Sequence, residues 1–64
     1  MEVFIERVHK TKIVHFKGTV KELLKKMDIN PVVVLVVRNN ELLAEDDILK
    51  TKDNIRILSV VSGG

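Results

Sequence analysis

The chain has 64 residues, which is enough for one small domain. Because it contains no cysteine, it can have no disulfide, no thiolate metal site and no cysteine nucleophile. A net charge of +2, with two phenylalanines as the aromatic residues, argues against a nucleic-acid-binding surface. The longest apolar run, Val32 to Val37, is far shorter than the roughly 20 residues that span a bilayer, and no secretory signal is visible. We therefore expect a cytoplasmic protein without a membrane partner.

The first residues alternate between apolar and charged side chains. This alternation predicts a strand from Glu2 to Val8. Val3 and Ile5 would face inward, and Phe4 would point to the opposite face of the sheet.

A second strand is expected after the polar break His9-Lys10-Thr11. It would cover Lys12 to Phe16, where apolar residues again alternate with polar ones. Val14 and Phe16 would then be the inward pair.

The clearest local signal is a helix between Gly18 and Met27. Thr19 is a helix-capping residue, and Glu22 three positions later completes a capping box. One apolar stripe follows at helical spacing, formed by Val20, Leu23, Leu24 and Met27. The helix should end before Pro31, because a residue that precedes proline avoids helical backbone angles.

The next segment predicts a hairpin. Val32 to Arg38 is rich in β-branched residues and apolar on both faces, as in a buried strand. Asn39-Asn40 tolerates positive φ angles and marks a tight turn, after which Glu41 to Leu43 forms a short strand.

The last third predicts an irregular segment followed by a final strand. Ala44 to Asp53 is expected to be irregular, with a turn of helix over Asp46 to Leu49. Lys52-Asp53-Asn54 would lead into a strand from Ile55 to Val61. The order is strand, strand, helix, strand, strand, strand, which predicts an α+β fold with one helix packed on a mixed five-stranded sheet.

The final strand is followed almost at once by the end of the sequence, Ser62-Gly63-Gly64. A terminal carboxyl has a reference pKa of about 3.3–3.7, so it is anionic near neutrality and can act as a nucleophile. Glycines lack a Cβ and can enter a narrow slot, and three extended residues span at most about 10 Å. Gly64 is thus a candidate reactive group that a partner enzyme would have to activate.

The whole chain resembles the ThiS and MoaD families of small sulfur carriers, which are ubiquitin-like β-grasp proteins. The resemblance is carried by the helix start Thr19 to Leu24, by the strand and asparagine turn Leu35 to Glu41, and by the closing strand and diglycine Ile57 to Gly64. It implies a single β-grasp domain over residues 1–61, in which the last strand lies between the first and third strands, and a flexible tail over residues 62–64. The absence of prolines before the tail and the short length favour ThiS over MoaD.

The resemblance also implies a mechanism. A ubiquitin-activating-type enzyme would bind the carrier and Mg-ATP, and the Gly64 carboxylate would be adenylated. A persulfide sulfur would then displace AMP and leave a thiocarboxylate. A sulfur acceptor, such as thiazole synthase in thiamine biosynthesis, would take the sulfur. In this interpretation the chain is a protein co-substrate, not an enzyme, and binds no cofactor itself.

Three other functions stay open. A MoaD-like carrier would serve molybdopterin synthesis, and a ubiquitin-like modifier would join Gly64 to target lysines. A plain binding module, such as a TGS-like nucleic-acid domain, would tolerate loss of Gly63-Gly64 and is disfavoured by the weak net charge.

The face of the sheet away from the helix is the expected partner-binding surface. Phe4 and one parity of Val32 to Val37 would form an apolar patch there, unless the Ala44 to Asp53 segment covers it. The strand that leads to the tail adds Arg56, Leu58 and Val60. We hypothesise that this face binds both the activating enzyme and the sulfur acceptor.

No metal site is expected. His9 and His15 are the only histidines, and zinc needs three or four converging ligands. The run Glu45-Asp46-Asp47 is interpreted as solvated or capping carboxylates.

Overall fold

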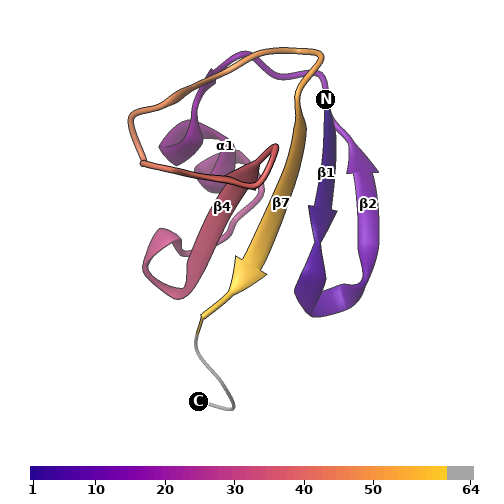
Figure 1. The fold of residues 1–64 in the computed structure, drawn as a ribbon, viewed down its shortest axis with the longest axis vertical. Helices are drawn as coiled ribbons and strands as arrows, with labels where there is room; N and C mark the ends of the chain where they lie inside the picture. Colours follow the sequence, from indigo (N-terminus) through magenta and orange to yellow (C-terminus); the bar gives the residue numbers. More distant parts are fainter. Residues whose placement is uncertain (61–64) are drawn as a thin grey trace.

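The computed structural model describes residues 1–60, and Figure 1 shows its ribbon. Its elements in chain order are β1 (Glu2–Ile5), the 3₁₀ turn η1 (Glu6–Val8), β2 (Lys10–Ile13), β3 (Gly18–Thr19), α1 (Val20–Lys26), the 3₁₀ turn η2 (Pro31–Val33), β4 (Val34–Arg38), β5 (Glu41–Leu43), β6 (Ile48–Leu49) and β7 (Asn54–Ser59). Within this part of the chain, no helix has the length and apolarity needed to cross a membrane.

Five strands form one mixed sheet in the order β2-β1-β7-β4-β5. The last strand, β7, runs parallel to β1 and antiparallel to β4, between the two, as Figure 1 shows. The predicted β-grasp arrangement, with the closing strand between the first and third long strands, is confirmed.

The hydrophobic core lies between α1 and one face of this sheet. Its fully buried members share the inward parity of their strands or the inner stripe of the helix: Val3, Val20, Leu23, Leu24, Val36, Leu49, Ile55 and Ile57. Ile5, Val14, Phe16 and Met27 pack against it and are partly buried. The inward positions predicted from alternation are therefore confirmed.

The helix begins with the predicted capping box. The Thr19 hydroxyl accepts a hydrogen bond from the Glu22 N–H (3.2 Å), and the Glu22 carboxylate accepts one from the Thr19 N–H (3.0 Å). Gly18 precedes the cap with φ +159°, and a Cβ there would lie 3.0 Å from Phe16 Cζ and 3.1 Å from Glu22 Oε1. A larger residue at this position would therefore require the Phe16 and Glu22 side chains to shift.

The β4–β5 hairpin closes through the predicted asparagine turn. Asn39 and Asn40 both adopt left-handed backbone angles, with φ 52° and 64°. Two consecutive residues with positive φ form the turn whose twist matches a two-residue hairpin. The turn sets Val37 opposite Leu42 and Val36 opposite Leu43.

The N-terminal hairpin differs from its prediction at both strands. β1 ends at Ile5, and the chain turns through η1 into His9, which has a left-handed φ of 51°. β2 then covers Lys10–Ile13, not Lys12 to Phe16. Apolar alternation misplaced this strand because β2 has few core contacts, whereas Val14 and Phe16 pack on the core from the loop that follows.

The Ala44 to Asp53 segment contains no helical turn at Asp46 to Leu49, so that prediction was wrong. Instead, Ile48–Leu49 forms β6 and pairs antiparallel with Gly18–Thr19 in a separate two-stranded sheet. Leu49 is fully buried, and burying it against the helix outweighs the local preference of the acidic stretch for a helical turn.

The predicted bounds of two other strands shift. Pro31–Val33 forms a 3₁₀ turn, so the third long strand begins at Val34 and not at Val32. β7 ends at Ser59; Val61 and the predicted tail, residues 62–64, lie outside the described residues.

Candidate functional site

The strand that leads to the C-terminus is held on both sides. β7 pairs with β1 through Glu2 to Ile5 and with β4 through Val34 to Arg38. Just past its end, the Val60 N–H donates to the Val33 carbonyl at 2.9 Å. The last described residue is therefore fixed against the sheet. The predicted reactive residues Ser62, Gly63 and Gly64 lie outside the described residues.

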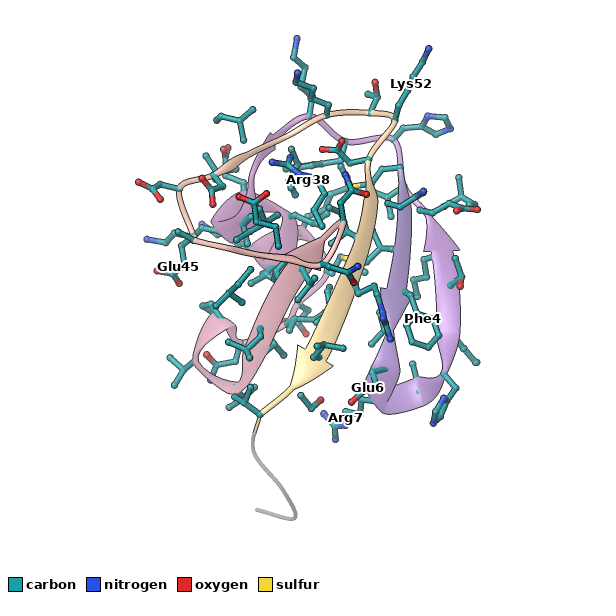
Figure 2. All side chains as sticks on the ribbon, in the orientation of Figure 1. Phe4, Glu6, Arg7, Arg38, Glu45 and Lys52 are labelled. Carbon is teal, nitrogen blue, oxygen red and sulfur yellow. The ribbon has the colours of Figure 1, made fainter. Side chains whose placement is uncertain are left out.

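The sheet face opposite α1 carries the side chains predicted to bind partners. Phe4 and Arg56 are register partners on β1 and β7, and the Arg56 guanidinium carbon lies 5.8 Å from the centre of the Phe4 ring. A cation at this distance over a ring is attracted by the ring's negative face. The His9 ring meets Phe4 edge-on, with ring centres 6.4 Å apart. Figure 2 shows Phe4 beside the lower part of β1.

We call this surface the open face. It consists of residues whose strand parity points away from the helix, namely Phe4, Ile13, Leu35, Val37, Leu42, Arg56 and Leu58. Several are strongly exposed for apolar residues: 66% for Ile13, 60% for Leu42 and 42% for Leu35. Val60, just beyond the strand, is 49% exposed. An exposed apolar group of this kind is typical of an interaction surface.

The Ala44 to Asp53 segment does not cover the open face. The N–H groups of Val20 and Lys21 donate to the Asp47 and Glu45 carbonyls at 3.0 and 2.9 Å, which fixes the segment beside the start of α1. Leu49 from this segment enters the core on the helix side. Of the two possibilities, an exposed patch or one covered by this segment, the structure supports the exposed patch.

The sequence analysis missed two members of the open face. Leu42 lies opposite Val37 on β5, and Ile13 lies opposite Glu2 on β2. The signal for Leu42 was the asparagine turn, because a two-residue turn sets the pairing of the two strands. The signal for Ile13 was the alternation of the predicted second strand, because an inward Val14 places its neighbour Ile13 on the opposite face.

Comparison with known proteins gives the family of this chain. The model of the ThiS family matches residues 3–64, which is nearly the entire chain. The chain belongs to the ThiS family. The match extends through both terminal glycines.

This ThiS-family protein is also similar to "Sulfur carrier protein TtuB" of Thermus thermophilus. The two are 37% identical over 60 residues, which is 91% of this chain and 92% of the relative. Both findings support a sulfur carrier protein. A sulfur carrier in general requires an activating enzyme and a sulfur acceptor as partners, and it is not itself an enzyme.

The acidic and histidine residues do not assemble a metal site within residues 1–60, where no three potential ligands converge. Asp47 Oδ2 instead accepts a hydrogen bond from the Ala44 N–H at 2.7 Å, so this member of the acidic run caps a turn. His9 and His15 are both exposed. The interpretation of these residues as surface or capping groups agrees with their positions.

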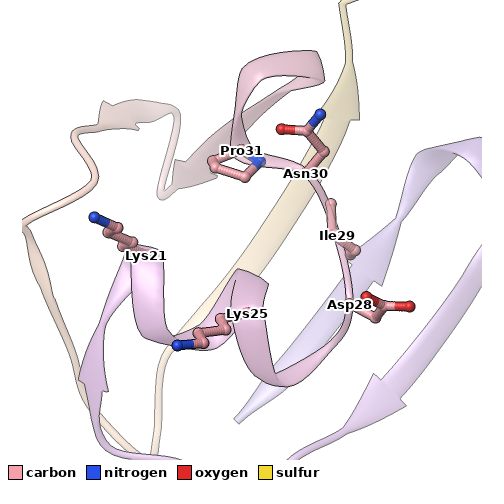
Figure 3. A pocket seen from close by; sticks show the side chains of 6 residues that line it. All are labelled: Lys21, Lys25, Asp28, Ile29, Asn30 and Pro31. Atoms are coloured by element: carbon pink, nitrogen blue, oxygen red, sulfur yellow. The ribbon is translucent and has the colours of Figure 1, made fainter.

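Two hollows lie near the C-terminal end of α1. One, of about 410 Å³, is lined by Lys21, Lys25, Asp28, Ile29, Asn30 and Pro31. Figure 3 shows that Lys21 and Lys25 come from successive turns of α1, while the other four follow the helix into the next strand. The second, larger hollow lies between this connection and β2.

Proposed function

We propose that this ThiS-family protein carries sulfur as a thiocarboxylate on Gly64. The observation that carries the proposal is the family match, which runs to residue 64 and includes the diglycine only a few residues after the central strand. Gly64 supplies the carboxylate, Gly63 supplies a residue without a Cβ, and Ser62 links both to the domain. A narrow active site of a partner can admit such a tail while the folded body stays outside.

The proposed chemistry begins with adenylation. A carboxylate oxygen of Gly64 attacks the α-phosphate of ATP, held with Mg²⁺ by the activating enzyme, and pyrophosphate leaves. A persulfide sulfur then attacks the acyl carbon and AMP leaves. Cleavage of the resulting sulfur–sulfur bond by a thiol leaves the thiocarboxylate. The sequence has no phosphate-binding glycine loop, so the nucleotide belongs to the partner enzyme.

The open face is the proposed docking surface for the ubiquitin-activating-type enzyme. Phe4 lies on β1 and Arg56 and Leu58 lie on the central strand β7, which Val60 follows directly. A partner bound there would hold the start of the tail in a defined position. The exposed apolar members would provide buried area, and Arg56 would provide a charge that orients the complex.

Thiazole synthase, in thiamine biosynthesis, is the proposed acceptor. The family name supports it, while the name of the Thermus relative specifies a sulfur carrier without an acceptor. A MoaD-like role in molybdopterin synthesis and conjugation of Gly64 to lysines are the alternatives.

The deciding experiment is intact mass spectrometry of the protein purified from its own host, with nothing fused after Gly64. A fraction heavier by the difference between one sulfur and one oxygen atom supports the carrier. Digestion should place the added mass on the peptide that ends in Gly64. A plain carboxylate throughout, with Gly64 found on lysines of other proteins, would replace the carrier with a modifier.

The acceptor is tested by deleting the gene and measuring three classes of sulfur-containing product: thiamine, molybdopterin and thiolated tRNA nucleosides. Loss of thiamine alone supports thiazole synthase. Loss of another class instead would reassign the acceptor and leave the carrier proposal intact.

A further inference from the structure

The larger hollow is a groove of about 660 Å³ on the helix side of the sheet. Its apolar lining comes from Ile5, Val8, Met27, Ile29, Val33, Val34 and Ile57. It exists because α1 has only seven residues and leaves the nearby end of the sheet uncovered. Ser59, the last residue of β7, also lines it, so the groove begins beside the start of the tail.

One side of the groove is strongly basic. Arg7, Lys10 and Lys12 line it, against the single carboxylate of Asp28. The strand register explains why the two lysines line the groove. Lys12 lies opposite the buried Val3 and Lys10 lies opposite Ile5, so both lysine side chains point to the helix side of β2. Figure 2 shows Arg7 at the same end of the molecule, near the end of β7.

The strand that borders the groove has a free edge. β2 is the terminal strand of the sheet and pairs only with β1 among the described residues. The Val14 N–H donates to the Met1 carbonyl at 2.8 Å, and antiparallel pairing alternates from there. The backbone N–H and C=O groups of Lys12 and Lys10 therefore form hydrogen bonds with β1. The backbone N–H and C=O groups of Thr11 and Ile13 point away from β1, toward the free edge.

We propose that this groove binds an extended segment of a partner protein, aliphatic in the middle and acidic at its ends, which pairs with β2 as an added strand. Thr11 and Ile13 supply backbone hydrogen bonds, the apolar lining receives alternate side chains, and Arg7, Lys10 and Lys12 pair with the acidic ends. Addition of a strand to an exposed edge is a general mode of peptide recognition.

Charge also selects the occupant. A second copy of this chain would bring its own Lys10 and Lys12 against the first pair, and like charges on facing strands repel. An acidic segment is attracted instead. The groove lies on the opposite side of the sheet from the open face, so a partner held here leaves Phe4 and Arg56 accessible. The inference does not depend on sulfur chemistry.

The test uses the full chain, labelled with ¹⁵N, and a synthetic peptide with a Val/Ile core between glutamates. We expect saturable binding with a dissociation constant of about 100 μM or tighter. The largest amide shifts should fall on Lys10 to Ile13 and on Met27 to Ile29. N-methylation of alternate peptide residues should weaken binding at least about tenfold, because it removes the donors that pair with β2.

The protein variant is Lys10→Glu combined with Lys12→Glu, and it should weaken binding at least about tenfold. The matched control is Lys21→Glu with Lys25→Glu, which changes the net charge equally on the outer face of α1 (Figure 3) and should change binding less than about twofold. A dispersed amide spectrum confirms that each variant is folded.

Three results of the peptide experiment would overturn the inference. The first is no binding, the second is equal loss in both double variants, and the third is shifts that map to open-face residues away from β2, namely Leu35, Leu42 and Leu58. Tighter binding of a single-stranded RNA oligonucleotide at the same residues would also overturn it, in favour of a nucleic-acid surface.

Discussion

Arg38 bonds to Asp53 across 15 residues of sequence, with Arg38 Nη1 3.0 Å from Asp53 Oδ2. The same nitrogen donates to the Ile48 carbonyl at 3.0 Å. Asp53 Oδ2 also accepts from the Lys50 N–H at 2.8 Å. Arg38 ends β4, so this group of bonds attaches both ends of the β6 region to the sheet and keeps Leu49 in the core. Figure 2 shows Arg38 beneath the chain that crosses from β6 to β7.

Asp53→Ala should therefore lower the free energy of unfolding by about 1–2 kcal/mol near neutral pH, measured by urea denaturation. Burial alone would raise the pKa of Asp53, but the hydrogen bonds from Lys50 and Arg38 and their positive charges together lower it. A carboxylate with a lowered folded-state pKa stabilises the fold above its unfolded pKa of about 3.9 and loses this effect as the pH falls through the folded value.

The difference between wild type and Asp53→Ala should thus shrink from about pH 7 to about pH 3. Asp46→Ala is the control, because Asp46 is exposed in the same acidic region. An equal loss in the control, or a difference that does not change with pH, would refute this role of Asp53.

Thr19→Ala should destabilise the protein by about 1 kcal/mol, because it removes the hydroxyl that caps α1. The hydrogen bond from the Thr19 N–H, followed by the one from its hydroxyl, lowers the pKa of Glu22. NMR titration should therefore show the Glu22 pKa rising in the variant. Thr51→Ala, in an exposed turn, is the control and should leave both quantities unchanged.

Phe4→Glu should reduce adenylation of the chain by its activating enzyme at least about 30-fold, the effect of losing one interface hot spot. The measurement is pyrophosphate release at several carrier concentrations. Ile48→Glu is the matched control, since it introduces the same charge at an exposed apolar residue of β6, away from the open face. Normal activation of folded Phe4→Glu would exclude the open face as the docking surface.

Deletion of Gly63-Gly64 should abolish adenylation without a change in melting temperature, because it retains every core residue found among residues 1–60. Addition of one residue after Gly64 should have the same effect, since the new carboxylate is displaced from the site of attack. Intact mass after incubation with the activating enzyme, ATP and a sulfur source measures the outcome. Full activity of either variant would contradict a role for the Gly64 carboxylate.

Much of the fold could be predicted from local sequence. The capping box, the helix stripe and the asparagine turn each depend on residues within a few positions of one another, and each is confirmed. Phe4 and Arg56 were likewise placed on one face by the two-residue period of strands. Their proposed role in docking stays a prediction.

Other features depended on contacts between distant segments. Ile48–Leu49 is a strand because Gly18–Thr19 lies beside it and because the core accepts Leu49, and neither condition is visible in the local sequence. Lys10–Ile13 is a strand although it has no apolar alternation, since β1 supplies its hydrogen bonds and the short helix leaves its inner face uncovered.

The sequence by itself therefore determined the succession of long strands along the chain and the single capped helix, because these follow from local backbone preferences and side-chain periodicity. Only the tertiary structure decided which apolar side chains remain exposed. The open face is exposed because, among residues 1–60, the helix packs on the other side of the sheet, whereas the basic groove exists because seven residues of helix cover only part of five strands.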